Sequence, residues 1–337
     1  MLSRRRWYNQ RTVRVGIVGI VGIVVVLAAC GRKEPSAKDR AVEATKAASG
    51  SAAAPAETTA ARAECKQLPF AETAPVPEAS GAAWMTLEGK LSLVVISDSG
   101  NDGAYVVLDP ETGAVRESGK LPLGGKGDDL EGVAVRGGKL YAVTSPGWIR
   151  VWERAAGAWN LVDGPYPLGP VDLDEGKGNK PPKGDGMVCP QKRTNCGRNY
   201  EGLCLAPEAH AAGSPCVGFA AAKGDGHLYC LVERDGRLTF DLTVPRIEIT
   251  HPGAMADCAF ADDGALFVGS NAFDLAAVYR VDRWRTPGNA VKVEYGALGP
   301  GFPETIAART EGTGHVIYRM SDLGGAPSLM AKYHCPR

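Results

Sequence analysis

Acidic residues recur in one short phrase along the chain. The sequence reads DLEGVA at residues 129–134 and NYEGLC at residues 199–204, with looser copies at 255–260 (MADCAF) and 302–307 (FPETIA). The acids of the four copies are Glu131, Glu201, Asp257 and Glu304. Carboxylates that are brought together must raise their pKa values, spread into water or share a cation. Hard oxygen ligands of this kind suit Ca²⁺, with Mg²⁺ or Mn²⁺ as alternatives.

Each acid also has a structural interpretation. A carboxylate at the entry of a strand can accept backbone N–H groups and hold neighbouring strands in register. The glycine that follows the acid in two copies, Gly132 and Gly202, lets neighbouring backbones approach closely. A fifth copy, ASGAAW at residues 79–84, carries Ser80 at the position of the acid. The sequence alone leaves metal binding and strand positioning open.

The surrounding pattern predicts the elements that position these acids. In residues 65–337, short apolar runs of period two alternate with turns rich in Gly, Asp, Asn and Pro, which predicts strands and hairpins. Each acidic phrase is followed by a turn and an apolar strand, a repeat typical of a β-propeller blade. At about 45 residues per blade, the folded part predicts about six blades; a β-sandwich is the alternative. Inner strands line the channel of a propeller, so the acids are expected to converge at one mouth.

One long insertion and the cysteines complete the predicted domain. Residues 165–196 are dominated by Pro, Gly and Lys and are expected to form a long loop. Apart from Cys30, eight cysteines remain, an even number that predicts disulfides in an exported protein, whereas a zinc site would lack CxxC spacing. Cys189 and Cys196 would pin the loop, and the terminal Cys65 and Cys335 would close the ring. The other four candidates are Cys204, Cys216, Cys230 and Cys258.

The N-terminus predicts export and lipidation. Several arginines precede the apolar run 15–27, which ends in LAAC, so residues 1–29 are expected to be a lipoprotein signal peptide and Cys30 the acylated residue. An uncleaved membrane anchor is the alternative, but the run is short for the roughly 20 residues that span a bilayer. Residues 30–64 lack the apolar surface to fold and predict a disordered tether. The partner would be a membrane, with Gly31 favouring the bacterial outer membrane; twin-arginine export is an alternative to the general route.

Part of the sequence resembles a known family. The phrases DLEGVAV and NYEGLCL, together with VVISDSG at residues 94–100, resemble the exported esterase-like or phytase-like β-propeller domain family over Pro77–Lys332. The resemblance implies a six-bladed, periplasmic or secreted propeller with suspected esterase or phosphoesterase activity that often depends on a cation. The Lys and Arg clusters of calcium-dependent phytases are not evident as a motif, which does not favour phytate hydrolysis.

Composition narrows the function without naming a substrate. Lysine plus arginine and aspartate plus glutamate each number 38, and no basic patch interleaves with aromatic residues, which excludes typical nucleic-acid binders. No G-x-S-x-G motif is present. The sequence therefore predicts a lipid-anchored binding or scaffold module for a small molecule, glycan or protein, with calcium at the channel mouth. A metal-assisted phosphoesterase, esterase or lactonase is the enzymatic alternative, and a purely structural envelope protein is the third.

Overall fold

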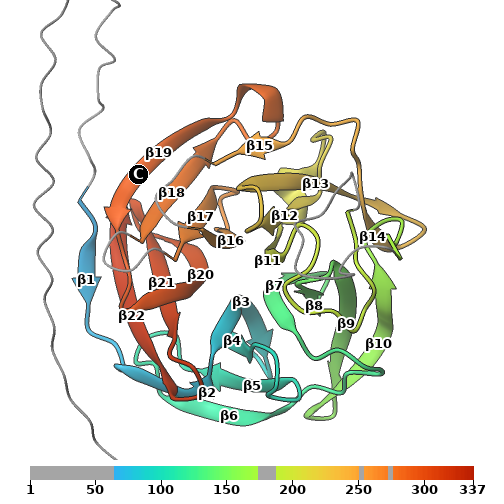
Figure 1. Cartoon of the computed structure of the whole chain (residues 1–337). Helices are drawn as coiled ribbons and strands as arrows, with labels where there is room; N and C mark the ends of the chain where they lie inside the picture. The colour runs from blue at the N-terminus through green and yellow to red at the C-terminus, as the bar shows by residue number, and fades with distance from the viewer. Residues whose placement is uncertain (1–63, 174–186, 250–253, 272–275) are drawn as a thin grey trace, which may run out of the picture. The chain divides into compact units, whose positions relative to one another are not determined.

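Five antiparallel β-sheets surround a central axis in the computed structural model of the chain (Figure 1). The structure describes residues 64–173, 187–249, 254–271 and 276–337. The predicted signal peptide, the acylated Cys30 and the tether up to residue 63 lie outside the described residues. So do residues 174–186 of the predicted loop.

The first four sheets are blades of four consecutive strands, numbered from the axis outwards. Blade 1 consists of β3 (Ala79–Leu87), β4 (Lys90–Ser97), β5 (Ala104–Leu108) and β6 (Val115–Lys120). Blade 2 consists of β7 (Leu130–Arg136), β8 (Lys139–Thr144), β9 (Trp148–Ala155) and β10 (Ala158–Pro167). Blade 3 consists of β11 (Tyr200–Leu205), β12 (Gly218–Ala222), β13 (His227–Arg234) and β14 (Arg237–Phe240), with β15 (Ile247–Glu248) added to β13. Blade 4 consists of β16 (Met255–Phe260), β17 (Leu266–Ser270), β18 (Ala277–Asp282) and β19 (Val291–Ala297). Two short helical turns, α2 (Glu208–Ala211) and η1 (Pro287–Asn289), connect strands within blades 3 and 4.

Blade 5 joins the two ends of the described chain. Its strands are β20 (Phe302–Glu311), β21 (Gly314–Asp322) and β22 (Pro327–Pro336), and β1 (Lys66–Leu68) and β2 (Thr73–Pro77) both pair with β22. Lys66 lies opposite His334, and Thr73 lies opposite Leu329. Figure 1 shows β1 running along the outer edge of β22. The ring is therefore closed by pairing strands from the two ends of the described chain in one blade.

The β-propeller fold predicted from the sequence is confirmed, but the prediction of about six blades is wrong. The described residues form five blades. The count of about six divided all residues of the folded part by an average blade length. The residues in the long connection between β10 and β11, and those between β14 and β16, were therefore counted toward a sixth blade. The N-terminal strands add to blade 5 instead of opening a sheet of their own. Among the described residues, no helix is long and apolar enough to cross a membrane.

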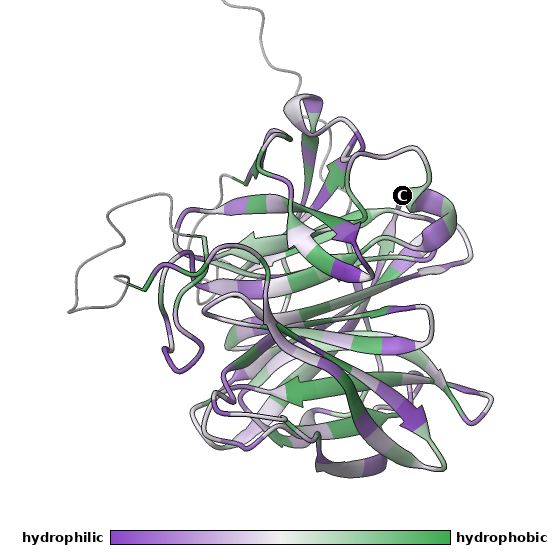
Figure 2. Cartoon of the chain, turned by 90° about the vertical axis from the view of Figure 1, so that its right-hand side faces the viewer, coloured by the Kyte–Doolittle hydropathy of each residue, from purple (hydrophilic) through white to green (hydrophobic). Residues whose placement is uncertain are grey.

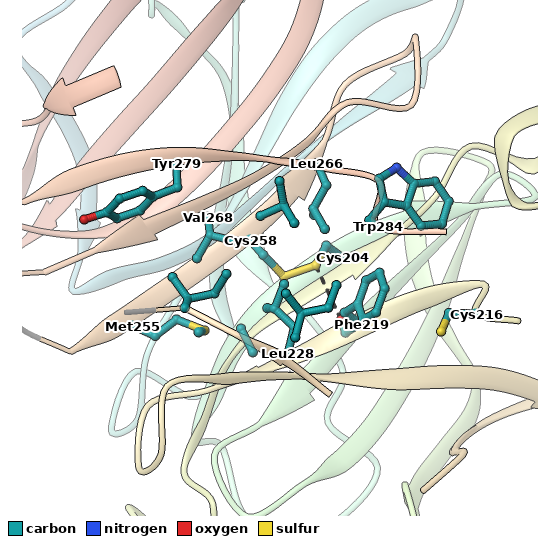
Figure 3. Close-up of a cluster of buried hydrophobic side chains, with 14 of the residues drawn as sticks. Cys204, Cys216, Phe219, Leu228, Met255, Cys258, Leu266, Val268, Tyr279 and Trp284 are labelled. Carbon is teal, nitrogen blue, oxygen red and sulfur yellow. Dashed lines mark hydrogen bonds between the residues drawn. A yellow bond between two sulfur atoms is a disulfide. The ribbon is translucent and has the colours of Figure 1, made fainter. Parts of the chain in front are cut away.

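Apolar residues fill the spaces between neighbouring blades. Each of the five interfaces holds one cluster of buried side chains. Hydrophobic residues run along the strands, while hydrophilic residues gather at the turns and strand ends (Figure 2). The cluster between blades 3 and 4 packs Phe219 and Leu228 against Leu266 and Trp284 (Figure 3). Burial on both faces explains why the inner strands are nearly continuous apolar runs.

The structure contains four disulfides, as the even number of cysteines predicted. Cys65 bonds to Cys335 and Cys189 bonds to Cys196, the two pairs expected from their positions. The remaining pairs are Cys204–Cys258 and Cys216–Cys230. Cys204–Cys258 joins the inner strands of blades 3 and 4 within their apolar cluster (Figure 3). Cys65–Cys335 spans 270 residues, so it restricts the unfolded chain far more than a short loop would.

One position on each inner strand faces the inner strand of the next blade. It holds Gly81, Gly132 and Gly202 in the first three blades, then Asp257 and Thr305. A Cβ on Gly132 would overlap the backbone nitrogen of Leu203, and one on Gly202 would lie 2.8 Å from that of Cys258. The role expected for Gly132 and Gly202, close approach of neighbouring backbones, is therefore confirmed.

We predict that Gly132→Ala destabilises the propeller by roughly 1–3 kcal/mol, because the added methyl group forces blades 2 and 3 apart. The matched control is Gly288→Ala in η1, where the nearest atom to a new Cβ, Pro245 Cγ, is 3.8 Å away. The control is expected to change the free energy of unfolding by no more than about 0.5 kcal/mol. Urea denaturation measures both. Equal effects of the two substitutions would contradict the close contact between the inner strands.

Candidate metal centre

Each inner strand has a β-bulge near its start, and the bulges gather the acids at one mouth of the channel. In blades 1, 3, 4 and 5 one residue there lacks a direct cross-strand partner: Ser80, Glu201, Ala256 and Glu304. In blade 2 both Glu131 and Gly132 lack one, and Glu131, which precedes the glycine as Glu201 precedes Gly202, is the equivalent residue. Because the five inner strands surround one axis, equivalent positions face a common space (Figure 1). The structure therefore brings Glu131, Glu201 and Glu304 to the mouth, as the repeat indicated.

Asp257 does not belong to this set, which corrects the sequence prediction. The residue equivalent to Glu131 in blade 4 is Ala256, so the sequence alignment was one residue out of register. Asp257 Oδ2 accepts the backbone N–H of Ile306 in blade 5 at 3.1 Å, and Oδ1 accepts that of Cys258 at 2.7 Å. Burial raises the pKa of this carboxyl, against the effect of those two hydrogen bonds. Asp257 thus accepts backbone N–H groups and holds neighbouring strands in register, which is the structural role that the sequence left open for each of the four acids.

One half of the mouth is neutralised by a lysine. Lys223 follows β12, and its Nζ lies 2.9 Å from Glu201 Oε2 and 3.5 Å from Glu304 Oε1. Asn199 Nδ2 donates to Glu201 Oε1 at 2.7 Å, and Asn271 Nδ2 donates to Glu304 Oε1 at 3.0 Å. The two carboxylates raise the pKa of Lys223 although burial acts in the opposite direction. We call this half, formed by Lys223, Glu201 and Glu304, the lysine half.

The other half contains three carboxylates that Lys223 does not pair with. Asp98 directly follows β4, Asp129 directly precedes β7, and Glu131 lies in β7. One oxygen from each of these three side chains lies within 4.8 Å of the others. The Ser80 hydroxyl donates to Glu131, and the Ser145 hydroxyl donates to Asp129. We call Asp98, Asp129 and Glu131 the carboxylate half; within the described residues, no lysine or arginine forms an ion pair with it.

Burial and mutual repulsion hold the carboxyl groups of the mouth away from their usual pKa values. The pKa of Asp98 rises to about 7, first through burial and then through the charges of Asp129, Glu304 and Glu78. Burial also raises the pKa of Asp129, and burial with the charges of Glu201, Asp98 and Asp129 raises that of Glu131 well above its usual value. Burial raises the pKa of Glu201 to about 8, although Lys223 opposes the shift. The folded protein therefore favours protons, or another cation, at this mouth.

The carboxylate half has the donors that a divalent cation requires. Calcium takes carboxylate oxygens at 2.3–2.6 Å, so oxygens on opposite sides of its coordination sphere are about 5 Å apart. The oxygens of Asp98, Asp129 and Glu131 lie within 4.8 Å of one another, which is less than that separation. Residues from two blades meet here, since Asp98 comes from blade 1 and the other two from the entry of blade 2.

Asp98 and Asp129 were not identified from the sequence. Both lie inside quoted motifs, VVISDSG and DLEGVAV, yet neither occupies the repeated acidic position. Asp129 stands two residues before Glu131, which was the available signal. Asp98 becomes a neighbour of Glu131 only through the packing of blade 1 against blade 2.

Comparisons with known proteins found similarity only among solved structures, and at low identity. No family model matches the chain, and no curated protein matches it. Among solved structures, the PQQ-bound aldose sugar dehydrogenase of Streptomyces coelicolor is 16% identical, with a TM-score of 0.47 over 82% of this chain and 99% of that one. A gluconolactonase from Xanthomonas campestris is 14% identical, with a TM-score of 0.44 over 78% and 88%. The glutaminyl cyclase of Myxococcus xanthus is 13% identical, with a TM-score of 0.45 over 82% and 99%. At these values the likeness does not assign an activity, and the resemblance to phytase-like propellers stays a prediction.

We predict that the metal-free protein becomes more stable as the pH falls from 8 to 5.5. A carboxyl group whose pKa is higher in the folded than in the unfolded protein stabilises the fold below its unfolded pKa, and that stabilisation is lost as pH rises through the folded value. For Asp98 the window runs from the usual value of 3.8 to about 7. Melting temperatures in the presence of EDTA measure the effect, which Asp98→Asn is expected to reduce. If the Asp98→Asn variant showed the same dependence of melting temperature on pH, the Asp98 carboxyl would not contribute to that dependence and its pKa would not be raised in the folded protein.

Proposed function

We propose that this protein is a calcium-dependent binding module whose cation sits in the carboxylate half of the channel mouth. The proposal rests on one observation: side-chain oxygens of Asp98, Asp129 and Glu131 lie within 4.8 Å of one another. None of these three carboxylates forms an ion pair with a lysine or arginine of the described residues. Two buried carboxylates and the partly buried one of Asp98 repel one another, and a divalent cation removes that repulsion more completely than protons do near neutral pH.

The lysine half explains why the cation would take one side of the mouth. Glu201 and Glu304 already share the ammonium group of Lys223, whereas Glu131 accepts a hydrogen bond from the Ser80 hydroxyl and has no cationic partner among the described residues. A cation in the lysine half would meet the like charge of Lys223. In the carboxylate half it would meet negative charge alone.

A cation in this position would be partly coordinated by the protein and would leave coordination sites for a ligand. Three carboxylates fill fewer than the six to eight oxygen positions that calcium takes. The remaining positions suit carboxylate, hydroxyl or carbonyl oxygens of a ligand at the mouth. The hydrolytic alternative, a metal-assisted esterase or lactonase, needs the same cation, so a calcium titration is the first test of both.

We predict that calcium raises the melting temperature of the full chain, and that Glu131→Gln abolishes this rise. Glu131→Gln is also expected to raise the melting temperature measured in EDTA, because it removes one of the repelling charges. Thermal unfolding with and without calcium measures both effects, and calorimetric titration measures the binding. The opposite signs in the two conditions separate loss of a ligand from a general loss of stability.

Two further variants sharpen this test. Glu304→Gln in the lysine half is expected to preserve calcium binding. The matched control is Glu153→Gln, because Glu153 is an exposed residue of β9 that pairs with Lys139. Calcium binding that survives Glu131→Gln and Asp129→Asn, or that depends equally on Glu304, would contradict a cation in the carboxylate half. Turnover of ester or lactone substrates only with calcium would favour the enzymatic alternative over binding alone.

We further propose that the propeller is held on the outer membrane of a bacterial cell by a lipid on Cys30. The support is in the sequence: the arginine-rich start, the apolar run 15–27 and the LAAC phrase. Two or more acyl chains give stable anchoring, whereas one is marginal. The tether at residues 30–64 would then join the lipid to the propeller.

We predict that Cys30→Ser prevents acylation and leaves the unprocessed precursor. Metabolic labelling with palmitate, followed by membrane fractionation, measures both outcomes. Labelled and processed protein in the Cys30→Ser variant would contradict the lipoprotein assignment without bearing on the cation site.

A further inference from the structure

A cavity separate from the channel mouth lies on blade 3. Its volume is about 500 Å³, within the range of small-molecule sites. It is bounded by the connection that precedes β11, by β13 and by residues 241–246 after β14. Apolar surface comes from Met187, Tyr229, Leu242, Val244 and Pro245, and the charged lining residues are Arg198, Arg246 and Asp241. We call it the blade 3 pocket; none of its lining residues belongs to the carboxylate half or to the lysine half.

Arg198 is held in place but incompletely satisfied by the protein. Its Nη1 lies 2.8 Å from Asp225 Oδ2, and its guanidinium group lies 5.7 Å from the centre of the Tyr229 ring. The Nε of Arg198 is buried and has no hydrogen-bond acceptor among the described residues. A buried donor without an acceptor costs free energy. The Arg198 side chain is 20% exposed and lines the pocket, so its fixed guanidinium group offers its exposed N–H groups, and not the buried Nε, to an incoming carboxylate.

The charges around the pocket leave one positive charge without a counterion. Asp225 pairs with Arg198, and Asp241 lies 3.6 Å from Arg234. Arg246 contacts the hydroxyl group of Tyr229. Within the described part of the chain, Arg246 has no carboxylate partner. A ligand with a single negative charge would balance the pocket.

The apolar residues that line the pocket indicate the chemistry of the ligand apart from its anionic group. Leu242 is 59% exposed, although it lines the pocket and stands beside Val244 and Pro245. The Tyr229 ring forms a second apolar surface, next to Arg198. Burying these surfaces requires an apolar body attached to the anionic group, since a bare inorganic anion would leave them in water.

We propose that the blade 3 pocket binds a small monocarboxylate with an apolar body. The carboxylate would accept hydrogen bonds from Arg198 and Arg246, and the body would cover Tyr229 and Leu242. The proposal is independent of the cation site, because it rests on other residues and needs no metal.

The test uses 4-phenylbutyrate as the probe and the full chain in the presence of EDTA. We expect saturable binding by calorimetric titration, and much weaker binding of the neutral analogue 4-phenyl-1-butanol. Arg246→Gln is expected to weaken binding of the acid by roughly tenfold, because one charge-assisted contact is lost. Arg198→Lys keeps the positive charge but loses the planar fork, and it is also expected to weaken binding.

The matched control is Arg237→Gln, an exposed arginine of β14 that pairs with Asp163 outside the pocket. It should leave the affinity for 4-phenylbutyrate unchanged. No binding of the probe at millimolar concentration, equal binding of the alcohol, or equal affinity of inorganic phosphate would overturn the proposal. So would an Arg246→Gln variant that folds normally and binds as the parent does. Glu131→Gln distinguishes the two sites, because it is expected to abolish calcium binding and to leave the affinity for 4-phenylbutyrate unchanged.

Discussion

The close approach of five inner strands around one axis is the constraint on which the rest of this structure depends. At the position that faces the next blade, three strands have glycine, and a Cβ there would overlap neighbouring backbone. The other two use polar side chains instead: Asp257 accepts the N–H of Ile306, and Thr305 Oγ1 donates to the carbonyl of Ala79 at 2.8 Å. Close contact positions blades 1 to 3 against their neighbours, and hydrogen bonds do so for blades 4 and 5, so every blade is positioned by the next one. Pairing of β1 and β2 with β22 and the Cys65–Cys335 disulfide fix the same ring at its outer edge.

The same constraint creates the chemistry of the channel mouth. Bulges at equivalent positions direct Glu131, Glu201 and Glu304 into one space, where burial and mutual repulsion raise the pKa values of Glu131 and Glu201. Blade 4 contributes Ala256 at this level, between the two blades whose acids Lys223 joins. The lysine compensates one half of the mouth, and the half formed by Asp98, Asp129 and Glu131 keeps its excess negative charge.

The blade 3 pocket follows from a different part of the architecture. It is formed by β13 and by the connections before β11 and after β14, and such connections are free to vary because the inner strands already carry the fold. Its charge differs from that of the mouth: two arginines and Asp241, which pairs with Arg234, adjoin apolar surface, whereas the mouth gathers acids. One propeller thus offers two chemically distinct sites, one suited to a divalent cation and one suited to an organic anion.

The sequence by itself determined the propeller, the even set of disulfide cysteines and the convergence of Glu131, Glu201 and Glu304. These features follow from local patterns, because period-two apolar runs specify strands and a repeated phrase specifies repeated positions. The tertiary structure alone decided the number of blades, because an average blade length does not show how much of the chain goes into long connections or into the strands β1 and β2 that complete blade 5. It also decided that Ala256, and not Asp257, faces the mouth, because a bulge shifts the register by one residue and is defined only by pairing across strands. The partners Asp98 and Lys223 lie outside the repeated phrase, and only the packing of blades around the axis brings their charges to the acids.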